Sequence, residues 1–469
     1  MESQKEVFKW VRPIYNVRRI HPRRMPIQLA HKLGLRDYFA LAFGTMIGSG
    51  WLVLMDDWLG RGGPLGVMLG FTIGAVALLP VGYVYGEWVK RMPEAVGEAT
   101  YTAQVFPPIL SYFTGWMMLL AYFIVGPWEA VAVGKVAAYL FPAVNSMELY
   151  RVADHPVYLP RLVLGIAMIV FLGVLNYRGI RGSASFQKMA TTTVLALVAS
   201  VAAVSVAHGS PANFRPAFQA APLVSIFLVL QIVPYFLTGF ESVPKAAEEA
   251  KADFPPQNFF RAIVLALLTG AGFYVAAAAA VSLSAPWQSL AGKSFVTALA
   301  FGQAMGTEWP VRVVLAAAMI GLLQCFNGNF VAASRMIFSF GRSGTVAARF
   351  GAVHSRFQTP YVAVIGISLA TLIAVLLGDA LLVPVTEVGS MASATGWFAA
   401  SLSLFLLEKR PGVRGIAGFA AVISLLLVLM KIIPAFPGHF SHAEWIALAI
   451  WIALGWILHV ARPRAAKAT

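Results

Sequence analysis

The chain has 469 residues, of which 59% are apolar and only 12% are charged, whereas soluble domains carry about 25% charged residues. This composition excludes an ordinary soluble enzyme, and the scattered glycines and prolines exclude a collagen-like or disordered chain. The net charge is +15 at neutral pH. The single cysteine, Cys325, excludes an internal disulfide and a zinc–thiolate site, and we expect neither a metal nor a cofactor.

Long apolar runs bounded by glycine, proline and charged residues predict twelve membrane-spanning helices. A helix needs about 20 apolar residues to cross a bilayer, so the chain has room for roughly a dozen spans. In chain order the predicted spans cover 37–60, 64–89, 110–141, 157–177, 187–208, 222–247, 259–284, 309–339, 361–378, 381–407, 414–434 and 443–461. The sequence therefore predicts an all-α polytopic membrane protein.

The basic residues lie almost entirely between these spans and mostly on one side. Lys135 lies inside the third span, and the few on the far side are Arg61, Arg151, Arg161, Arg215, Lys293, Arg312 and Lys431. Because cytoplasmic loops are enriched in Lys and Arg, this asymmetry predicts cytoplasmic N- and C-termini in a plasma membrane of the bacterial inner-membrane type. It accounts for the net charge without nucleic acid as a partner. Residues 1–36 form a basic arm expected to contact lipid, and 462–469 a cytoplasmic tail.

Two of the predicted spans are interrupted near their middles. The first contains Gly48, Ser49 and Gly50, and the sixth is expected to break between Leu237 and Glu241. Inside a bilayer, unwound backbone is tolerated only where it is buried in protein or lines a water-filled site. Close packing of helices on small residues is the alternative explanation.

The two interruptions lie five spans apart, which suggests an internal repeat. Many transporters consist of two five-helix halves of inverted topology whose first helices are broken at the membrane midplane. We therefore predict a first repeat in 37–208, a second repeat in 222–407 and two peripheral helices in 414–461.

Sequence motifs accompany both interruptions. The motifs are Ile47-Gly48-Ser49-Gly50 in the first span, then Gly239-Phe240-Glu241, Ala247-Glu248-Glu249-Ala250-Lys251 and Arg261-Ala262-Ile263 in and after the sixth. Together they resemble the signature of the amino acid–polyamine–organocation transporter family, over about residues 36–410. The resemblance implies a broken-helix, inverted-repeat fold of the LeuT type and alternating-access transport of amino acids or related amines.

The interruptions offer groups that would bind a zwitterion. Free N–H groups at Gly48 to Gly50 would begin an outer half-helix, whose positive end favours a carboxylate. Free carbonyl groups at the two breaks would accept hydrogen bonds from an ammonium. Glycine allows the backbone to approach the ligand closely. The predicted substrate-binding residues are Ile47, Gly48, Ser49, Gly50, Trp51, Thr238, Gly239, Phe240, Glu241 and Glu129.

Charged residues within the spans are functional candidates by default. Glu241 can pair with a substrate ammonium, take up a proton or cap a half-helix. Glu129 can bind a cationic substrate or relay a proton. Lys135 follows it by six positions, which rotates the helix by about 240° and excludes a local (i, i+4) ion pair between the two. Both therefore need partners elsewhere. The candidates for proton coupling are Glu241, Glu129 and Lys135, while sodium coupling and exchange without an ion stay open.

Other functions are weighed against amino acid transport. The runner-up substrate is an amine without a carboxylate, such as a polyamine or amino alcohol, which would use Glu129 and Asp57. A sensor that binds without transport would share the pocket. A membrane enzyme is disfavoured because the eight His residues are dispersed, and a channel because no repeated filter occurs. The charged run Glu248, Glu249, Lys251 and Asp253 is expected to be structural or to act in gating. The sequence predicts no oligomeric state.

Overall fold

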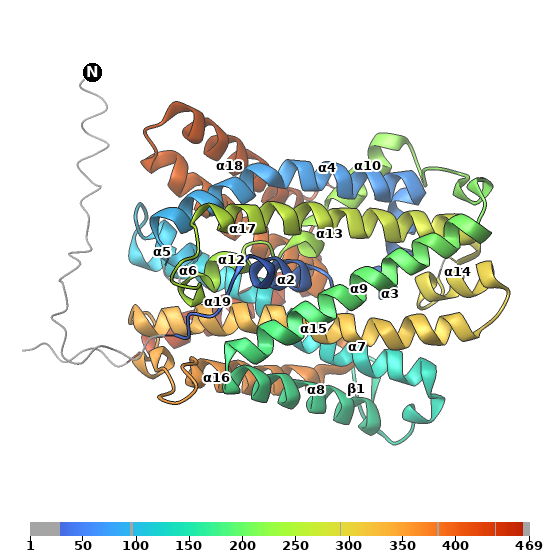
Figure 1. The fold of residues 1–469 in the computed structure, drawn as a ribbon, viewed down its shortest axis with the longest axis horizontal. Helices are drawn as coiled ribbons and strands as arrows, with labels where there is room; N and C mark the ends of the chain where they lie inside the picture. The colour runs from blue at the N-terminus through green and yellow to red at the C-terminus, as the bar shows by residue number, and fades with distance from the viewer. Residues whose placement is uncertain (1–28, 94–96, 291, 382–383, 437, 463–469) are drawn as a thin grey trace, which may run out of the picture.

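The computed structural model describes residues 29–93, 97–290, 292–381, 384–436 and 438–462. The predicted arm up to residue 28 and the tail from residue 463 lie outside the described residues. Within them, ten helices are long and apolar enough to cross a membrane. In Figure 1 the long helices run mostly along the longest axis of the molecule, and α2 lies near the middle of the view.

The elements follow one another as follows. The first helices are α2 (Leu35–Met46), α3 (Gly50–Val53), α4 (Met55–Arg91), α5 (Glu98–Thr102), α6 (Pro108–Phe123), α7 (Val125–Leu140), α8 (Leu159–Arg178) and α9 (Ile180–His208). Next come α10 (Pro222–Leu230), α11 (Val233–Leu237), α12 (Ser242–Lys245), α13 (Gln257–Ser284), α14 (Val296–Met305), α15 (Trp309–Arg342), α16 (Tyr361–Ala374), α17 (Pro384–Leu407), α18 (Pro411–Ile432) and α19 (His442–Val460). Short 3-10 helices are η2 (Pro142–Val144), η3 (Pro211–Phe214), η4 (Ala247–Glu249), η5 (Trp287–Leu290), η6 (Ala348–Gly351) and η7 (Val375–Leu381).

A few elements differ from the sequence prediction. Strands β1 (Glu148–Val152) and β2 (His155–Tyr158) form an antiparallel hairpin that was not expected, and neither was the ten-residue helix α14. Helix α9 begins at Ile180, earlier than predicted, directly after Gly179 with a φ of 141°. Helix α4 begins at Met55, within the predicted first span, and a kink at Gly63, whose φ is 64°, separates those residues from the predicted second span. The ten long helices otherwise coincide with the predicted second to fifth and seventh to twelfth spans.

The first and sixth predicted spans are the divided ones. Helix α2 ends at Met46, Ile47 is extended, and helical structure resumes at Gly50. Helix α11 ends at Leu237, and α12 begins at Ser242. Both predicted interruptions are thus confirmed.

The two interruptions touch each other at a glycine. Gly239 has a φ of 138°, a conformation that residues with a Cβ rarely adopt. A Cβ added there would lie 2.8 Å from the backbone nitrogen of Met46. Glycine at this position therefore allows the break after α11 to pack directly against the end of α2.

Around this contact, long helices and aromatic rings form the core. Helix α2 packs against α13, α9 and α15, and α4 packs against α10 and α13. The rings of Trp58 and Phe236 meet edge to face with centroids 4.6 Å apart, and Phe71 stacks on Tyr274 at 4.8 Å. Aromatic pairs of this kind add about 0.5–1.5 kcal/mol each beyond their buried area. The packing holds the broken segments in a rigid frame.

The segment before α2 pairs with the segment after η4. Leu33 and Ala250 form a parallel β-bridge. The amides of Lys32 and Leu33 donate to the carbonyl of Glu249 at 2.8 and 2.9 Å, and the amide of Lys251 donates to the carbonyl of Leu33 at 3.0 Å. These hydrogen bonds join the chain just before the N-terminus of α2 to the chain that follows α12 and η4.

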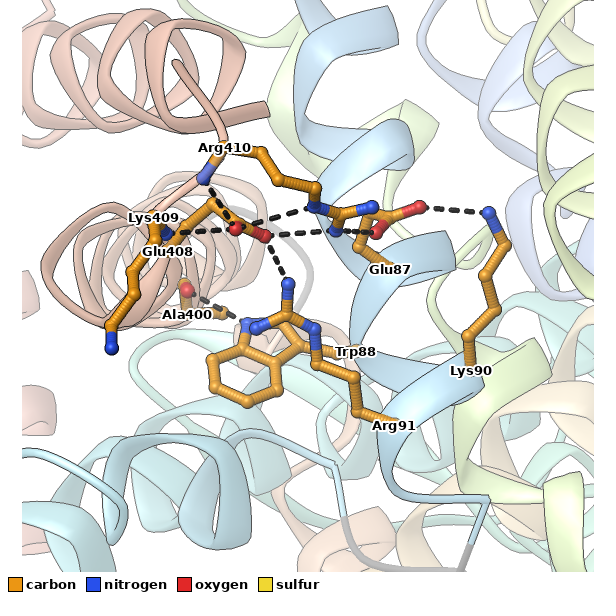
Figure 2. Close-up of polar contacts among 8 residues, drawn as sticks. All are labelled: Glu87, Trp88, Lys90, Arg91, Ala400, Glu408, Lys409 and Arg410. Atoms are coloured by element: carbon orange, nitrogen blue, oxygen red, sulfur yellow. Dashed lines mark hydrogen bonds and ion pairs between the residues drawn. The ribbon is translucent and has the colours of Figure 1, made fainter. Parts of the chain in front are cut away.

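A charged cluster links the end of α4 to the turn between α17 and α18 (Figure 2). Glu408 accepts from the side chain of Arg91, from the backbone amide of Arg410 at 2.8 Å and from its guanidinium at 2.9 Å. The Arg410 guanidinium also donates to Glu87 at 2.7 Å, and Glu87 pairs with Lys90 at 2.7 Å. Glu408 therefore lies among several cationic donors.

These donors make a pH-dependent contribution to stability. The hydrogen bonds from Arg410, together with the Arg91 side chain, hold the pKa of Glu408 well below its ordinary value of 4.5. A lowered folded-state pKa stabilises the fold fully above the unfolded-state value, and the contribution disappears as the pH falls toward the folded-state value. We expect Glu408→Gln to lower the melting temperature of the purified protein by a larger amount at pH 7 than at pH 3, where part of the contribution has been lost.

Glu308→Gln removes an exposed carboxylate and serves as the control, with no change expected at either pH. An equal loss for Glu408→Gln at both pH values would contradict the ionic origin of this contribution.

Candidate functional site

The two breaks enclose a small central cavity of about 20 Å³. It is lined by groups from both breaks and from the helices around them, including Gly48, Gly50, Thr238, Glu129, Tyr274 and Asn329. This volume is enough for about one water molecule. The predicted residues Ile47, Ser49, Trp51, Gly239, Phe240 and Glu241 are buried beside the breaks and are not among its lining.

Glu129 reaches the first break from α7. One carboxylate oxygen accepts from the Ser49 hydroxyl at 2.9 Å, and the other accepts from the Ser49 backbone amide at 3.2 Å. The residue is 2% exposed, and a Cβ on Gly48 would overlap its Oε1 atom. The backbone N–H of the break does meet an acidic group, as the sequence suggested, and in this structure that group is the carboxyl of a side chain of the protein.

The carbonyl groups at the end of α2 also have partners. The Tyr274 hydroxyl donates to the carbonyl of Met46 at 2.7 Å, and the Asn329 amide donates to that of Thr45 at 2.9 Å. The Oδ1 atom of Asn329 is buried without a hydrogen-bond partner among the described residues. Next to the first break, the group that remains without a hydrogen-bond partner among the described residues is therefore an acceptor, the Oδ1 atom of Asn329.

In the second break, Glu241 holds the unwound backbone. Its Oε2 atom accepts from the amide of Gly239 at 3.0 Å. The side chain forms no cap hydrogen bond to α12, so the predicted capping of the second half-helix is not observed. Its Oε1 atom is buried without a partner among the described residues. Phe240 packs on Trp397 with centroids 5.6 Å apart, and Trp51 packs on Phe273 at 5.5 Å. Both aromatics support the walls of the breaks.

A buried ion pair next to the second break was missed by the sequence analysis. Lys245, at the end of α12, lies 2.5 Å from Oε1 of Glu98 in α5, and the Tyr85 hydroxyl donates to the same oxygen at 2.5 Å. The Lys245 ammonium also lies 5.2 Å from the ring centroids of Tyr85 and Tyr122. A buried lysine needs such partners because an unpaired charge is costly in an apolar interior. The sequence does place a lysine next to the predicted break, which is a signal for a buried ion pair, but it does not indicate that Glu98 is the partner.

A much larger cavity, of about 720 Å³, lies beyond Trp128 and Phe236, which line both cavities and so stand between them. Its charged lining consists of Asp56, Asp57, Arg61, Lys135, Arg161 and Lys293. Lys135 lies 3.5 Å from Asp379, so it finds a partner outside its own helix, as predicted. It lines this large cavity and is not among the residues that line the central one.

Comparison with known proteins agrees with this architecture. A family model described as amino acid permease matches residues 33–458. A branched-chain amino acid permease of Bacillus subtilis is 24% identical, with 92% of each chain covered. A methylthioribose transporter of the same organism is 23% identical over 92% of this chain and 93% of its own. Cationic amino acid transporter 4 of Mus musculus is 24% identical over 82% of this chain and 61% of its own. The chain therefore belongs to the amino acid permease family and is a membrane transporter, not an enzyme.

Proposed function

We propose that this chain is a secondary active transporter that moves an amino acid by alternating access and couples this movement to protons. The observation that carries the proposal is the contact between two broken helices at a cavity lined by a buried carboxylate. Unwound backbone within a membrane is tolerated only where it is buried in protein or lines a cavity, and both breaks contribute residues to the lining of this cavity. Gly48 and Gly50 line this cavity, so a ligand bound there would contact the backbone of the first break directly.

The proposed arrangement is of the LeuT type, with twelve spans. Its two five-helix repeats are 37–208 and 222–407, and 414–461 forms the peripheral pair. The division of the first and sixth spans supports it, because these are the first helices of the two halves. The distribution of Lys and Arg supports a plasma-membrane location with both termini in the cytoplasm.

In an alternating-access cycle, the described conformation is outward-facing. The large cavity lies on the side that the charge distribution assigns to the exterior, and Trp128 and Phe236 separate it from the break. Toward the opposite end, buried ion pairs join Lys245 to Glu98 and Arg335 to Glu249. Opening to the cytoplasm requires movement of the segments that these pairs hold together.

Two carboxyl groups remain the candidates for proton coupling. Glu129 and Glu241 are both fully buried at the breaks, and neither forms an ion pair within 4.0 Å among the described residues. A carboxyl group that is not held in an ion pair can take up and release a proton, as coupling requires. Lys135 is a weaker candidate because it pairs with Asp379 at the large cavity.

Proteoliposome transport tests the proposal. Branched-chain, hydroxyl-bearing and cationic amino acids form the first panel, because the relatives include a branched-chain permease and a cationic amino acid transporter. We expect counterflow of at least one labelled amino acid, and faster uptake with an inward proton gradient than with an inward sodium gradient. Empty liposomes are the control. Specific binding without counterflow would identify a sensor, and stimulation by sodium alone would contradict proton coupling.

A further inference from the structure

The position that suits a substrate carboxylate in the first break is occupied by the protein itself. We propose that Glu129 competes with the substrate carboxylate for Ser49. An amino acid would then bind only with uptake of one proton by Glu129, whereas an amine without a carboxylate would bind beside ionised Glu129. This inference rests on the proposed transport function and specifies both the substrate chemistry and the origin of the coupling.

The competition follows from the small number of donors at the break. The Ser49 amide and hydroxyl both donate to Glu129, at 3.2 and 2.9 Å. A substrate carboxylate that takes these donors would leave a second carboxylate within the same buried space. Two such anions cannot both remain ionised at close range in a site of low dielectric constant.

No cation of the protein is placed to neutralise that second charge. The titratable groups that share the cavity with Glu129 are Tyr235 from α11, Tyr274 from α13 and Cys325 from α15, all neutral in their ordinary forms at pH 7. Lys135, on the same helix, is paired with Asp379. In the described part of the chain, Glu129 therefore relies on neutral donors, those of Ser49 and the thiol of Cys325, and on what enters the cavity.

A proton resolves the conflict for a zwitterion. When the substrate carboxylate displaces Glu129 from Ser49, the carboxyl of Glu129 takes one proton from water and becomes a neutral donor. An acceptor is available in the same cavity, since the Oδ1 atom of Asn329 has no partner among the described residues. No other bond forms or breaks. The ammonium and the carboxylate of the substrate cancel each other and protonated Glu129 is neutral, so the occupied site carries no net charge.

A ligand with an ammonium group and no carboxylate needs Glu129 in its ionised form, the opposite of what a zwitterion needs. It leaves the Glu129–Ser49 contact in place and pairs with the ionised carboxylate, while the carbonyls of Thr45 and Met46 keep their own donors. Protonation of Glu129 would remove this partner. Acid conditions should therefore strengthen amino acid binding and weaken amine binding at the same site.

Calorimetry on the purified full chain tests the inference with matched ligand pairs. The pairs are leucine with 3-methylbutylamine, threonine with 1-aminopropan-2-ol, and lysine with 1,5-diaminopentane. Titration in two buffers of different ionisation enthalpy counts the protons bound. We expect uptake approaching one proton for the amino acid and a rise in affinity of up to about tenfold for each unit of falling pH while Glu129 is ionised. We expect no uptake for the amine.

The Glu129→Gln variant keeps the size of the side chain and removes its charge. It should bind the amino acid without proton uptake and lose most of the affinity for the amine. Glu308→Gln, at an exposed position, should behave as the wild type. Amino acid binding without proton uptake by the wild type, or unchanged amine binding by Glu129→Gln, would overturn the inference while leaving transport intact. Absence of both binding and counterflow for all pairs would overturn the proposed function together with it.

Discussion

Replacing Gly48 with valine is expected to abolish amino acid uptake while leaving the protein inserted in the membrane. The first atom of any side chain at this position would overlap Oε1 of Glu129 and lie 2.9 Å from the sulfur of Cys325. The branched side chain of valine adds two more carbons to the same space. It would push Glu129 away from Ser49 and fill the central cavity, so uptake should fall to the level of empty liposomes.

The matched control is the same substitution at Gly60 in α4. An added Cβ there would meet no atom within 4 Å, so Gly60→Val should retain uptake close to that of the wild type. Yield in the membrane fraction and elution as a single species would establish that both variants fold. Uptake by well-folded Gly48→Val at the wild-type rate would refute the assignment of the first break as the substrate site.

Removing the guanidinium of Arg335 should cause the largest loss of stability. In α15, this side chain donates to both oxygens of Glu249, at 2.8 and 3.1 Å, and to the hydroxyl of Ser334 at 3.0 Å. Both members of the pair are fully buried. Arg335→Met would leave an unpaired carboxylate in the interior, which costs about 3–5 kcal/mol of unfolding free energy.

A double variant separates this cost from the loss of packing. In Arg335→Met with Glu249→Leu, no charge is left buried without a partner, so most of the lost stability should return. Thermal and denaturant unfolding of the purified variants in one detergent would measure the difference. If the single and double variants were equally unstable, packing and not the unpaired charge would be the cause.

The helix breaks were predictable because the signals for them are local. Gly48 and Gly50, and Gly239 with Pro234 before it, act on the backbone torsions of their own neighbourhood. Both interruptions therefore appear within the predicted ranges. The hairpin β1–β2 and helix α14 escaped prediction because the exposed strands lack a clear alternation and α14 is too short to span a bilayer.

The partners at the site could not be predicted, since they are brought together only by the fold. Glu129 and Ser49 lie 80 residues apart, and Glu98 and Lys245 lie 147 apart. A period of 3.6 residues indicates which face of a helix is apolar, but not which helix it will meet. The sequence made Glu129 a candidate for substrate recognition or proton relay, but it did not indicate that this carboxyl group meets Ser49 in the first break. The structure shows that Glu129 is already there.

The bridge between Leu33 and Ala250 has a consequence for how the protein can vary and move. Its bonds run between peptide groups, and a peptide group is the same whatever side chain it carries. Most substitutions in this β-bridge should therefore leave its hydrogen bonds intact. Proline has no N–H, so proline at Leu33 or Lys251 would remove one of these hydrogen bonds. While the bridge is formed, the two broken helices are joined at the N-terminal end of α2, and their segments there must move together.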